Sequence, residues 1–110
     1  MMNDDELLAQ RIRSELSQVA SLTEKKMFGG VGFLIRGNMA CGINKGRLIV
    51  RVGQENDEKA LAKPYTRPFD FSGKPMAGWV MVDPGGYDSG EELKNWIKLA
   101  VAFTLTLPAK

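Results

Sequence analysis

The stretch from Met27 to Val52 constrains the fold most, because it contains three short runs in which every second residue is apolar. The runs are separated by Arg36-Gly37-Asn38 and Asn44-Lys45-Gly46, both of which have the composition of tight turns. Alternation with a period of two, interrupted by Gly and Asn, is typical of antiparallel strands joined by short turns. The stretch therefore predicts a β-meander whose strands span residues 31–36, 39–44 and 47–52.

Two amphipathic patterns predict the main helices of the chain. Residues 3–20 and residues 89–107 both carry apolar side chains at three-to-four spacing, so each has a face to bury. Ser89 and Glu92 have the spacing of a capping box at the start of the second helix. A charged, alanine-containing segment, residues 54–62, predicts a shorter helix between them.

Two further strands are predicted at residues 68–71 and 78–82. Because Pro68 cannot donate a ladder hydrogen bond, the first of them is expected either to start at Pro68 or to lie at a sheet edge. With 110 residues, 44% of them hydrophobic, the chain is expected to form one domain over residues 1–110. The fold class predicted is α+β, with two layers, a five-stranded antiparallel sheet and the element order α-β-β-β-α-β-β-α. Four large side chains are expected to be buried in its core: Phe33, Val50, Phe69 and Trp96.

The lack of histidine limits the chemistry that this chain can perform. Without histidine there is no Ser-His-Asp or Cys-His nucleophile system and no His-containing metal site. Cys41 lies in the middle of a predicted strand, and we interpret it as a small buried hydrophobe rather than a reactive thiol. The sequence thus predicts no catalytic residue, no cofactor and no metal ligand.

The segment Gly29-Gly30-Val31-Gly32 invites comparison with a phosphate-binding loop. Such a loop leads into a helix and usually carries a following Lys with Ser or Thr. Here Phe33-Leu34-Ile35 continues as a strand, so we interpret the glycines as allowing a bulge, a bend or close packing against a helix.

The N-terminus is acidic where a secretion signal would be basic, and no stretch approaches the roughly 20 apolar residues that span a bilayer. We therefore expect a cytoplasmic protein without a membrane partner.

Basic residues on and around the meander are the candidates for nucleic-acid contact, although the net charge is only +2. The candidates are Lys25, Lys26, Arg36, Arg47 and Arg51. An ordinary solvated outer sheet face would explain them equally, and no aromatic residues alternate with the arginines as in RNA-stacking sheets.

A second apolar row on the last predicted helix comprises Leu99, Phe103 and Leu107. A helix on a single sheet buries only one broad face against it, so this row must meet the first helix or another subunit. We predict a homodimer interface there, with side-by-side packing of the two helices as the alternative.

Several segments resemble the N-terminal domain of the TfoX/Sxy family of bacterial competence regulators. They are residues 26–33, Lys-Met-Phe-Gly-Gly-Val-Gly-Phe, with the Gly37 turn, then residues 67–71, residues 76–82 and the Leu93-Trp96-Ala100 helix. The resemblance implies the same element order and a similarity to secretion-chaperone-like folds. It supplies no catalytic residues. In the family's regulators a helical C-terminal domain follows, and because this chain stops at Lys110, we expect a stand-alone member.

The expected function is accordingly a non-enzymatic regulatory or protein-interaction module that resembles the N-terminal domain of competence transcription regulators. One alternative is a nucleic-acid-binding accessory protein that uses a basic sheet face. Another is a small enzyme whose site the sequence does not reveal.

Overall fold

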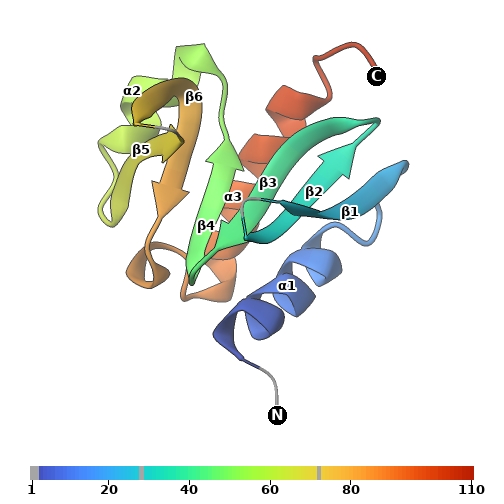
Figure 1. The fold of residues 1–110 in the computed structure, drawn as a ribbon, viewed down its shortest axis with the longest axis horizontal. Coiled ribbons are helices and arrows are strands. Elements are labelled where there is room, and N and C mark those ends of the chain that lie inside the picture. The colour runs from blue at the N-terminus through green and yellow to red at the C-terminus, as the bar shows by residue number, and fades with distance from the viewer. Residues whose placement is uncertain (1–2, 28, 72) are drawn as a thin grey trace.

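One antiparallel sheet carries the fold, and in the computed structural model its strands follow the order β1-β2-β3-β4-β6-β5 (Figure 1). The structure describes residues 3–27, 29–71 and 73–110. Phe28 of the Met-Phe-Gly-Gly segment lies outside the described residues, as does Ser72, the first residue of Ser72-Gly73-Lys74-Pro75, whose composition predicts a turn. The strands are β1 Leu22–Met27, β2 Gly30–Ile35, β3 Asn38–Asn44, β4 Arg47–Arg51, β5 Thr66–Phe71 and β6 Lys74–Val82.

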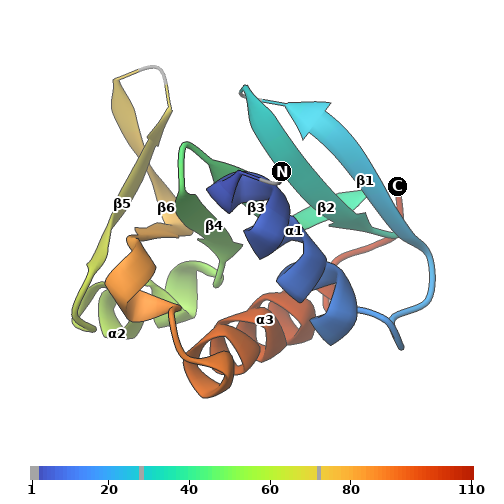
Figure 2. The same ribbon diagram turned by 90° about the horizontal axis from the view of Figure 1, so that it is seen from below.

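The helices all lie on one face of this sheet, which gives two layers (Figure 2). They are α1 Asp4–Glu15, α2 Asp57–Leu61 and α3 Gly90–Thr104, with 3-10 turns η1 Gln54–Asn56 and η2 Pro84–Gly86. Helix α3 packs across β3 and β4, and α1 packs beside α3 and against β3. The predicted α+β class with an antiparallel sheet and three helices is therefore confirmed.

The predicted number of strands is wrong, because the described residues form six strands rather than five. The additional strand is β1, which pairs with β2 from Leu22 opposite Ile35 to Met27 opposite Gly30. Its sequence, Leu-Thr-Glu-Lys-Lys-Met, has no apolar alternation, since an edge strand can leave side chains of both faces in water. The element order is consequently α-β-β-β-β-α-β-β-α, and α1 ends at Glu15 rather than near residue 20.

Both main helices begin where the sequence predicts, and side-chain caps explain why. The Asn3 side chain accepts a hydrogen bond from the Glu6 backbone N–H at 2.8 Å, and Ser89 Oγ accepts one from the Glu92 N–H at 3.0 Å. These bonds satisfy donors that the first turn of a helix otherwise leaves unpaired. Among the described residues, no helix is long and apolar enough to cross a bilayer.

The four large side chains predicted for the core are all buried: Phe33, Val50, Phe69 and Trp96. Three of them belong to the cluster between the sheet and the helices, whereas Phe69 lies outside it, with its ring centroid 6.0 Å from that of Trp79. Ile49 is also buried outside this cluster, although its strand neighbours Leu48 and Val50 belong to it. Since successive strand residues point to opposite faces, the outer face of the sheet has a buried apolar patch of its own.

Cys41 is fully buried, as predicted, and belongs to the cluster beneath the helices. Burial away from water raises the pKa of its thiol to about 12. The thiol is therefore protonated at neutral pH, which suits a packing role rather than nucleophilic chemistry.

Trp96 gives the first testable prediction. Its ring is 3% exposed, and its indole N–H donates to the Gly86 carbonyl at 3.0 Å, which ties α3 to η2. Trp96→Ala should therefore lower the free energy of unfolding by about 3–5 kcal/mol, measured by urea denaturation. A Trp96 fluorescence component that acrylamide quenches readily, measured in a Trp79→Phe background, would contradict this assignment.

Candidate interaction surface

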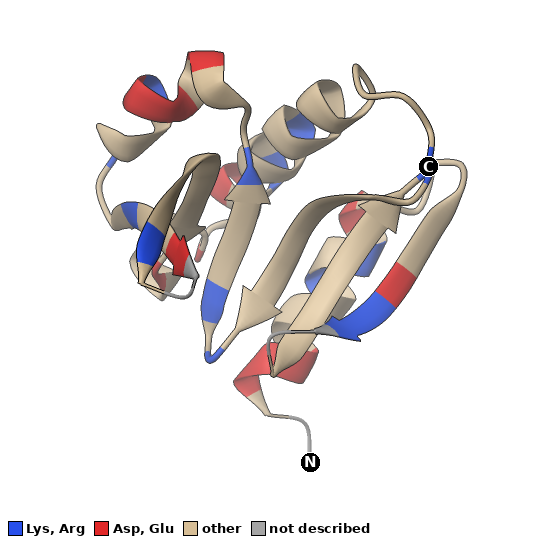
Figure 3. Ribbon diagram, turned by 45° about the horizontal axis from the view of Figure 1, so that its top comes forward, with Lys and Arg blue, Asp and Glu red and all other residues tan. Residues whose placement is uncertain are grey.

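The basic residues predicted to contact nucleic acid do not form one continuous face. Figure 3 shows the blue segments at separate places, on β1, at both ends of β4 and on β5. Lys25 and Lys26 are exposed on β1, but as neighbours in a strand they point to opposite faces. The three arginines each have partners within the chain.

Arg36 lies in the turn between β2 and β3 rather than on the sheet face, with a φ of 51°. Its guanidinium donates hydrogen bonds to the carbonyls of Leu105 and Leu107, both at 3.0 Å. The Lys110 N–H in turn donates to the Arg36 carbonyl at 2.8 Å. Arg36 thus fastens the segment after α3 to the sheet, which is a structural role.

Arg47 forms an ion pair on the outer face of the sheet. Its Nε lies 2.9 Å from Asp83 Oδ1, and Arg67 Nη2 lies 2.7 Å from Asp83 Oδ2. The hydrogen bonds from Arg67 and Arg47 lower the pKa of Asp83. Asp83 therefore neutralises part of the positive charge that the sequence suggested for this face.

Arg51 differs from these residues because its guanidinium lies near two aromatic rings. Its guanidinium carbon is 4.9 Å from the centroid of Trp79 and 5.7 Å from that of Phe103, both within cation–π distance. Its one described hydrogen bond runs from Nη1 to the Met39 carbonyl at 3.3 Å. Among the described residues, no carboxylate forms an ion pair with it, and burial lowers its pKa.

Two glycines shape the surface beside this arginine. Gly53 and Gly78 both have a φ of 86°, and the Val52 and Gly53 N–H groups both donate to the Gly78 carbonyl. A Cβ on Gly53 would lie 2.5 Å from the Phe103 ring, so the ring rests directly on the backbone. We call Arg51, Trp79, Phe103, Gly53 and Gly78 the Arg51 site.

The Arg51 site lines an open cavity of about 610 Å³ between the end of β4, the η1 segment and the end of α3. Val52, Gln54, Glu55, Asn56, Ala77 and Thr106 also line it. Arg51, Trp79 and Phe103 are all half-buried, and arginine and aromatic side chains are among those that most often anchor protein interfaces. The cavity can therefore accept an anionic group that carries an apolar body.

The structure thus joins residues from two separate predictions and adds one that the sequence did not indicate. Arg51 was a candidate for nucleic-acid contact and Phe103 for a dimer interface, whereas Trp79 was assigned no role. Trp79 reaches the site because β6 pairs with β4, with Arg51 directly opposite Trp79. Alternation within a strand indicates which face of the sheet each side chain occupies. It does not indicate which strands pair, so it could not place Trp79 beside Arg51.

The apolar row predicted as a dimer interface is half-buried within the monomer. Leu99 packs partly against the main cluster, Phe103 rests on Gly53, and Leu107 is also half-buried. Leu105, next to this row, is 49% exposed. The monomer therefore covers part of the row and leaves an apolar remainder at the end of α3.

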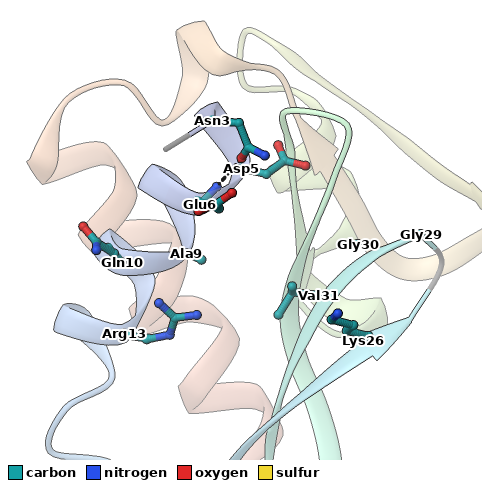
Figure 4. A pocket seen from close by; sticks show the side chains of 10 residues that line it. All are labelled: Asn3, Asp5, Glu6, Ala9, Gln10, Arg13, Lys26, Gly29, Gly30 and Val31. Atoms are coloured by element: carbon teal, nitrogen blue, oxygen red, sulfur yellow. Dashed lines mark hydrogen bonds between the residues drawn. The ribbon is translucent and has the colours of Figure 1, made fainter. Parts of the chain in front are cut away.

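A second cavity, of about 770 Å³, lies between α1 and the β1–β2 hairpin (Figure 4). Several of its charged groups already have partners, since Asp5 accepts from the Gly46 N–H at 2.7 Å and Arg13 pairs with Glu24 at 2.7 Å. A Cβ on Gly30 would overlap the Ile43 carbonyl oxygen, so this glycine permits close packing against the strand β3; a helix was the packing partner in one of the three interpretations of this segment. The chain continues from Gly30 into β2 and not into a helix, unlike a phosphate-binding loop.

Gly53 gives a prediction about the shape of the Arg51 site. Its φ of 86° and ψ of 150° lie in a region essentially restricted to glycine, and a Cβ would also displace the Phe103 ring. Gly53→Ala should lower the free energy of unfolding by about 1–3 kcal/mol more than Gly46→Ala, measured in urea. Gly46 is the control because it has a φ of 79° but no atom within 4 Å of an added Cβ. An equal loss of unfolding free energy in both variants would show that displacing the Phe103 ring has no energetic cost.

The nucleic-acid alternative predicts a steep dependence of binding on salt, measured by mobility shift with DNA and RNA. Lys25→Ala and Lys26→Ala should each flatten the log–log dependence by about one unit, because each removes one phosphate contact. Arg47→Ala should have the smaller effect, since Asp83 already neutralises that guanidinium. Absence of any shift at low salt eliminates this alternative.

Comparison with known proteins identifies the family. The sequence model of the TfoX N-terminal domain matches residues 14–104 of the 110-residue chain. A search of curated proteins finds no significant match. The matched region begins within α1, contains every strand and ends at the last residue of α3, so it includes the whole sheet and the Arg51 site. The chain therefore belongs to the TfoX N-terminal domain family.

Proposed function

We propose that this chain is a non-enzymatic regulatory module that acts by binding another protein through the Arg51 site. Membership of the TfoX N-terminal domain family supports a role like that of the competence regulators. The observation that carries the proposal is the half-buried Arg51 guanidinium, which two aromatic rings hold at an open cavity without a carboxylate partner among the described residues.

Partial burial of the Arg51 guanidinium has a cost in solvation free energy that a partner can offset. Partial burial removes water from Arg51, and cation–π contacts return only part of the lost solvation. A partner that supplies a counter-charge would gain a charge-assisted hydrogen bond and bury the Trp79 and Phe103 rings in the same step. Both gains arise only on association, which is how an interface anchor contributes binding energy.

A capture experiment with matched variants tests the proposal. The tagged chain is incubated with lysate with and without nuclease, and the captured proteins are identified and then purified for direct binding measurements. Binding of a purified partner should survive nuclease, fall at least tenfold with Arg51→Gln and persist with Arg13→Gln, whose exposed ion pair lies away from the site. Capture that nuclease abolishes would favour nucleic acid instead, and equal binding by both variants would exclude this site.

Self-association through the end of α3 is a second proposal, favoured by the exposed Leu105 beside the half-buried Phe103 and Leu107. Apolar groups that a monomer leaves in water often mark interfaces, and a two-fold dimer is the commonest arrangement. Sedimentation equilibrium should show a dimer that Phe103→Glu and Leu105→Glu dissociate.

Leu7 provides the control for this prediction because it is 48% exposed on α1, similar to the 49% of Leu105. Leu7→Glu should leave the dimer intact. A monomer at every concentration would contradict self-association. Loss of the circular dichroism signal with Phe103→Glu would instead assign that ring to the monomer core, and Leu105→Glu would then decide the question.

A further inference from the structure

We propose that the ligand of the Arg51 site is a peptide carboxylate next to an apolar side chain. The carboxylate would lie on the Arg51 guanidinium, and the apolar side chain would lie against the rings of Trp79 and Phe103. This inference rests on the proposed function, because it specifies the chemical group that the protein partner presents.

Arg51 differs from the other arginines in the hydrogen bonds that it makes within the chain. Arg13, Arg47 and Arg67 each contact a carboxylate at 2.7–2.9 Å. Arg11 and Arg36 each donate to two backbone carbonyls at 3.0–3.1 Å. Arg51 makes one described hydrogen bond, at 3.3 Å, so most of its five N–H donors have no described acceptor.

The remaining N–H groups of the Arg51 guanidinium have a geometry that suits a carboxylate. A guanidinium presents its N–H groups in a planar fork that matches the two oxygens of a carboxylate. The ring centroids of Trp79 and Phe103 lie 4.9 Å and 5.7 Å from the guanidinium carbon, so a carboxylate bound there would bring its adjoining apolar side chain near both rings. The Met39 carbonyl fixes one end of the fork.

The acidic residues around the cavity favour a ligand with one carboxylate over a phosphate chain. Glu55 lines the rim, and Asp57 accepts the Gly78 N–H at 3.0 Å on the same segment. Asp57 and Glu58 both lie in the first turn of α2. A polyanion such as nucleic acid would meet these carboxylates as well as Arg51, whereas a single carboxylate can contact Arg51 alone.

The cavity at Arg51 is large enough for the proposed ligand. The cavity of about 610 Å³ lies within the range of small-ligand sites, large enough for a side chain with its adjoining backbone. The positions that a Cβ would occupy at Gly53 and Gly78 are filled by the Phe103 ring and by the backbone of Gly53 and Gln54, so these glycines let the ring and the chain pack closely at the cavity wall. The site therefore offers a charged contact and an apolar wall together.

Trp79 provides a direct readout of binding. The probes are N-acetylphenylalanine, which carries a carboxylate and an apolar ring, and its amide, which carries the ring alone. Excitation near 295 nm selects tryptophan, and the buried Trp96 should respond little. We expect saturable fluorescence change with the acid at a Kd of about 1 mM, a range set by the small size of the probe.

Matched variants then identify the contact. Arg51→Gln should weaken binding of the acid at least tenfold, since it removes a charge-assisted hydrogen bond. Arg47→Gln, a charge loss on the same strand and face, should leave it unchanged, and Trp79→Phe should abolish the signal change. Arg51→Lys keeps the charge without the planar fork and should also weaken binding. Thermal melts confirm that each variant is folded.

The results that overturn the proposal are equally definite. Equal affinity for the acid and the amide would remove the carboxylate from the proposal, as would unchanged binding by Arg51→Gln. Stronger competition by inorganic phosphate than by acetate would assign the site to phosphate chemistry. If Arg51→Gln does not fold, Arg51→Lys replaces it as the test variant. Unchanged affinity of Arg51→Lys for the acid would contradict bidentate recognition.

Failure of this inference is distinguishable from failure of the proposed function. If the acid binds at Arg51 but no purified partner does, the carboxylate site remains and the protein-interaction function is wrong. If a partner binds with the predicted dependence on Arg51 while the acid and its amide bind alike, the interaction remains and the carboxylate ligand is wrong.

Discussion

The pairing of β4 with β6 is the interaction on which the rest of the molecule depends. It joins the meander to the β5–β6 hairpin, with Leu48 opposite Val82 and Val50 opposite Val80, so apolar side chains from both halves meet beneath α3. The same register places Arg51 opposite Trp79 on the other face. One ladder of backbone hydrogen bonds therefore builds the core and the Arg51 site together, and a one-residue slip would exchange the two faces.

The local parts of this arrangement could be predicted from the sequence, and the non-local parts could not. Alternation located β2, β3 and β4, and the capping-box spacing of Ser89 and Glu92 located the start of α3, because these signals lie within a few residues. The pairing of Arg51 with Trp79 joins residues far apart in the chain, and no pattern around either residue records the other. The secretion-chaperone-like fold remains a prediction.

The basic residues illustrate the same limit in electrostatic terms. Their positions in the sequence suggested one charged face, but a formal charge says nothing about its partner. Arg36 meets carbonyls about 70 residues away, and Arg47 meets Asp83, 36 residues away. Asp83 directly precedes η2, and its carboxylate pairs with both Arg47 and Arg67, a role that no pattern in the neighbouring sequence indicates. Only the three-dimensional arrangement separates a neutralised arginine from an available one.

The edges of the sheet carry a consequence for the behaviour of the protein in concentrated solution. Exposed edge strands invite pairing with other chains and hence aggregation. Strand β1 carries Glu24, Lys25 and Lys26 in succession, and β5 carries Pro68, which has no N–H to donate. The charges that concealed β1 from pattern recognition are thus the same groups that oppose fibril-like stacking at that edge, and proline restricts it at the other.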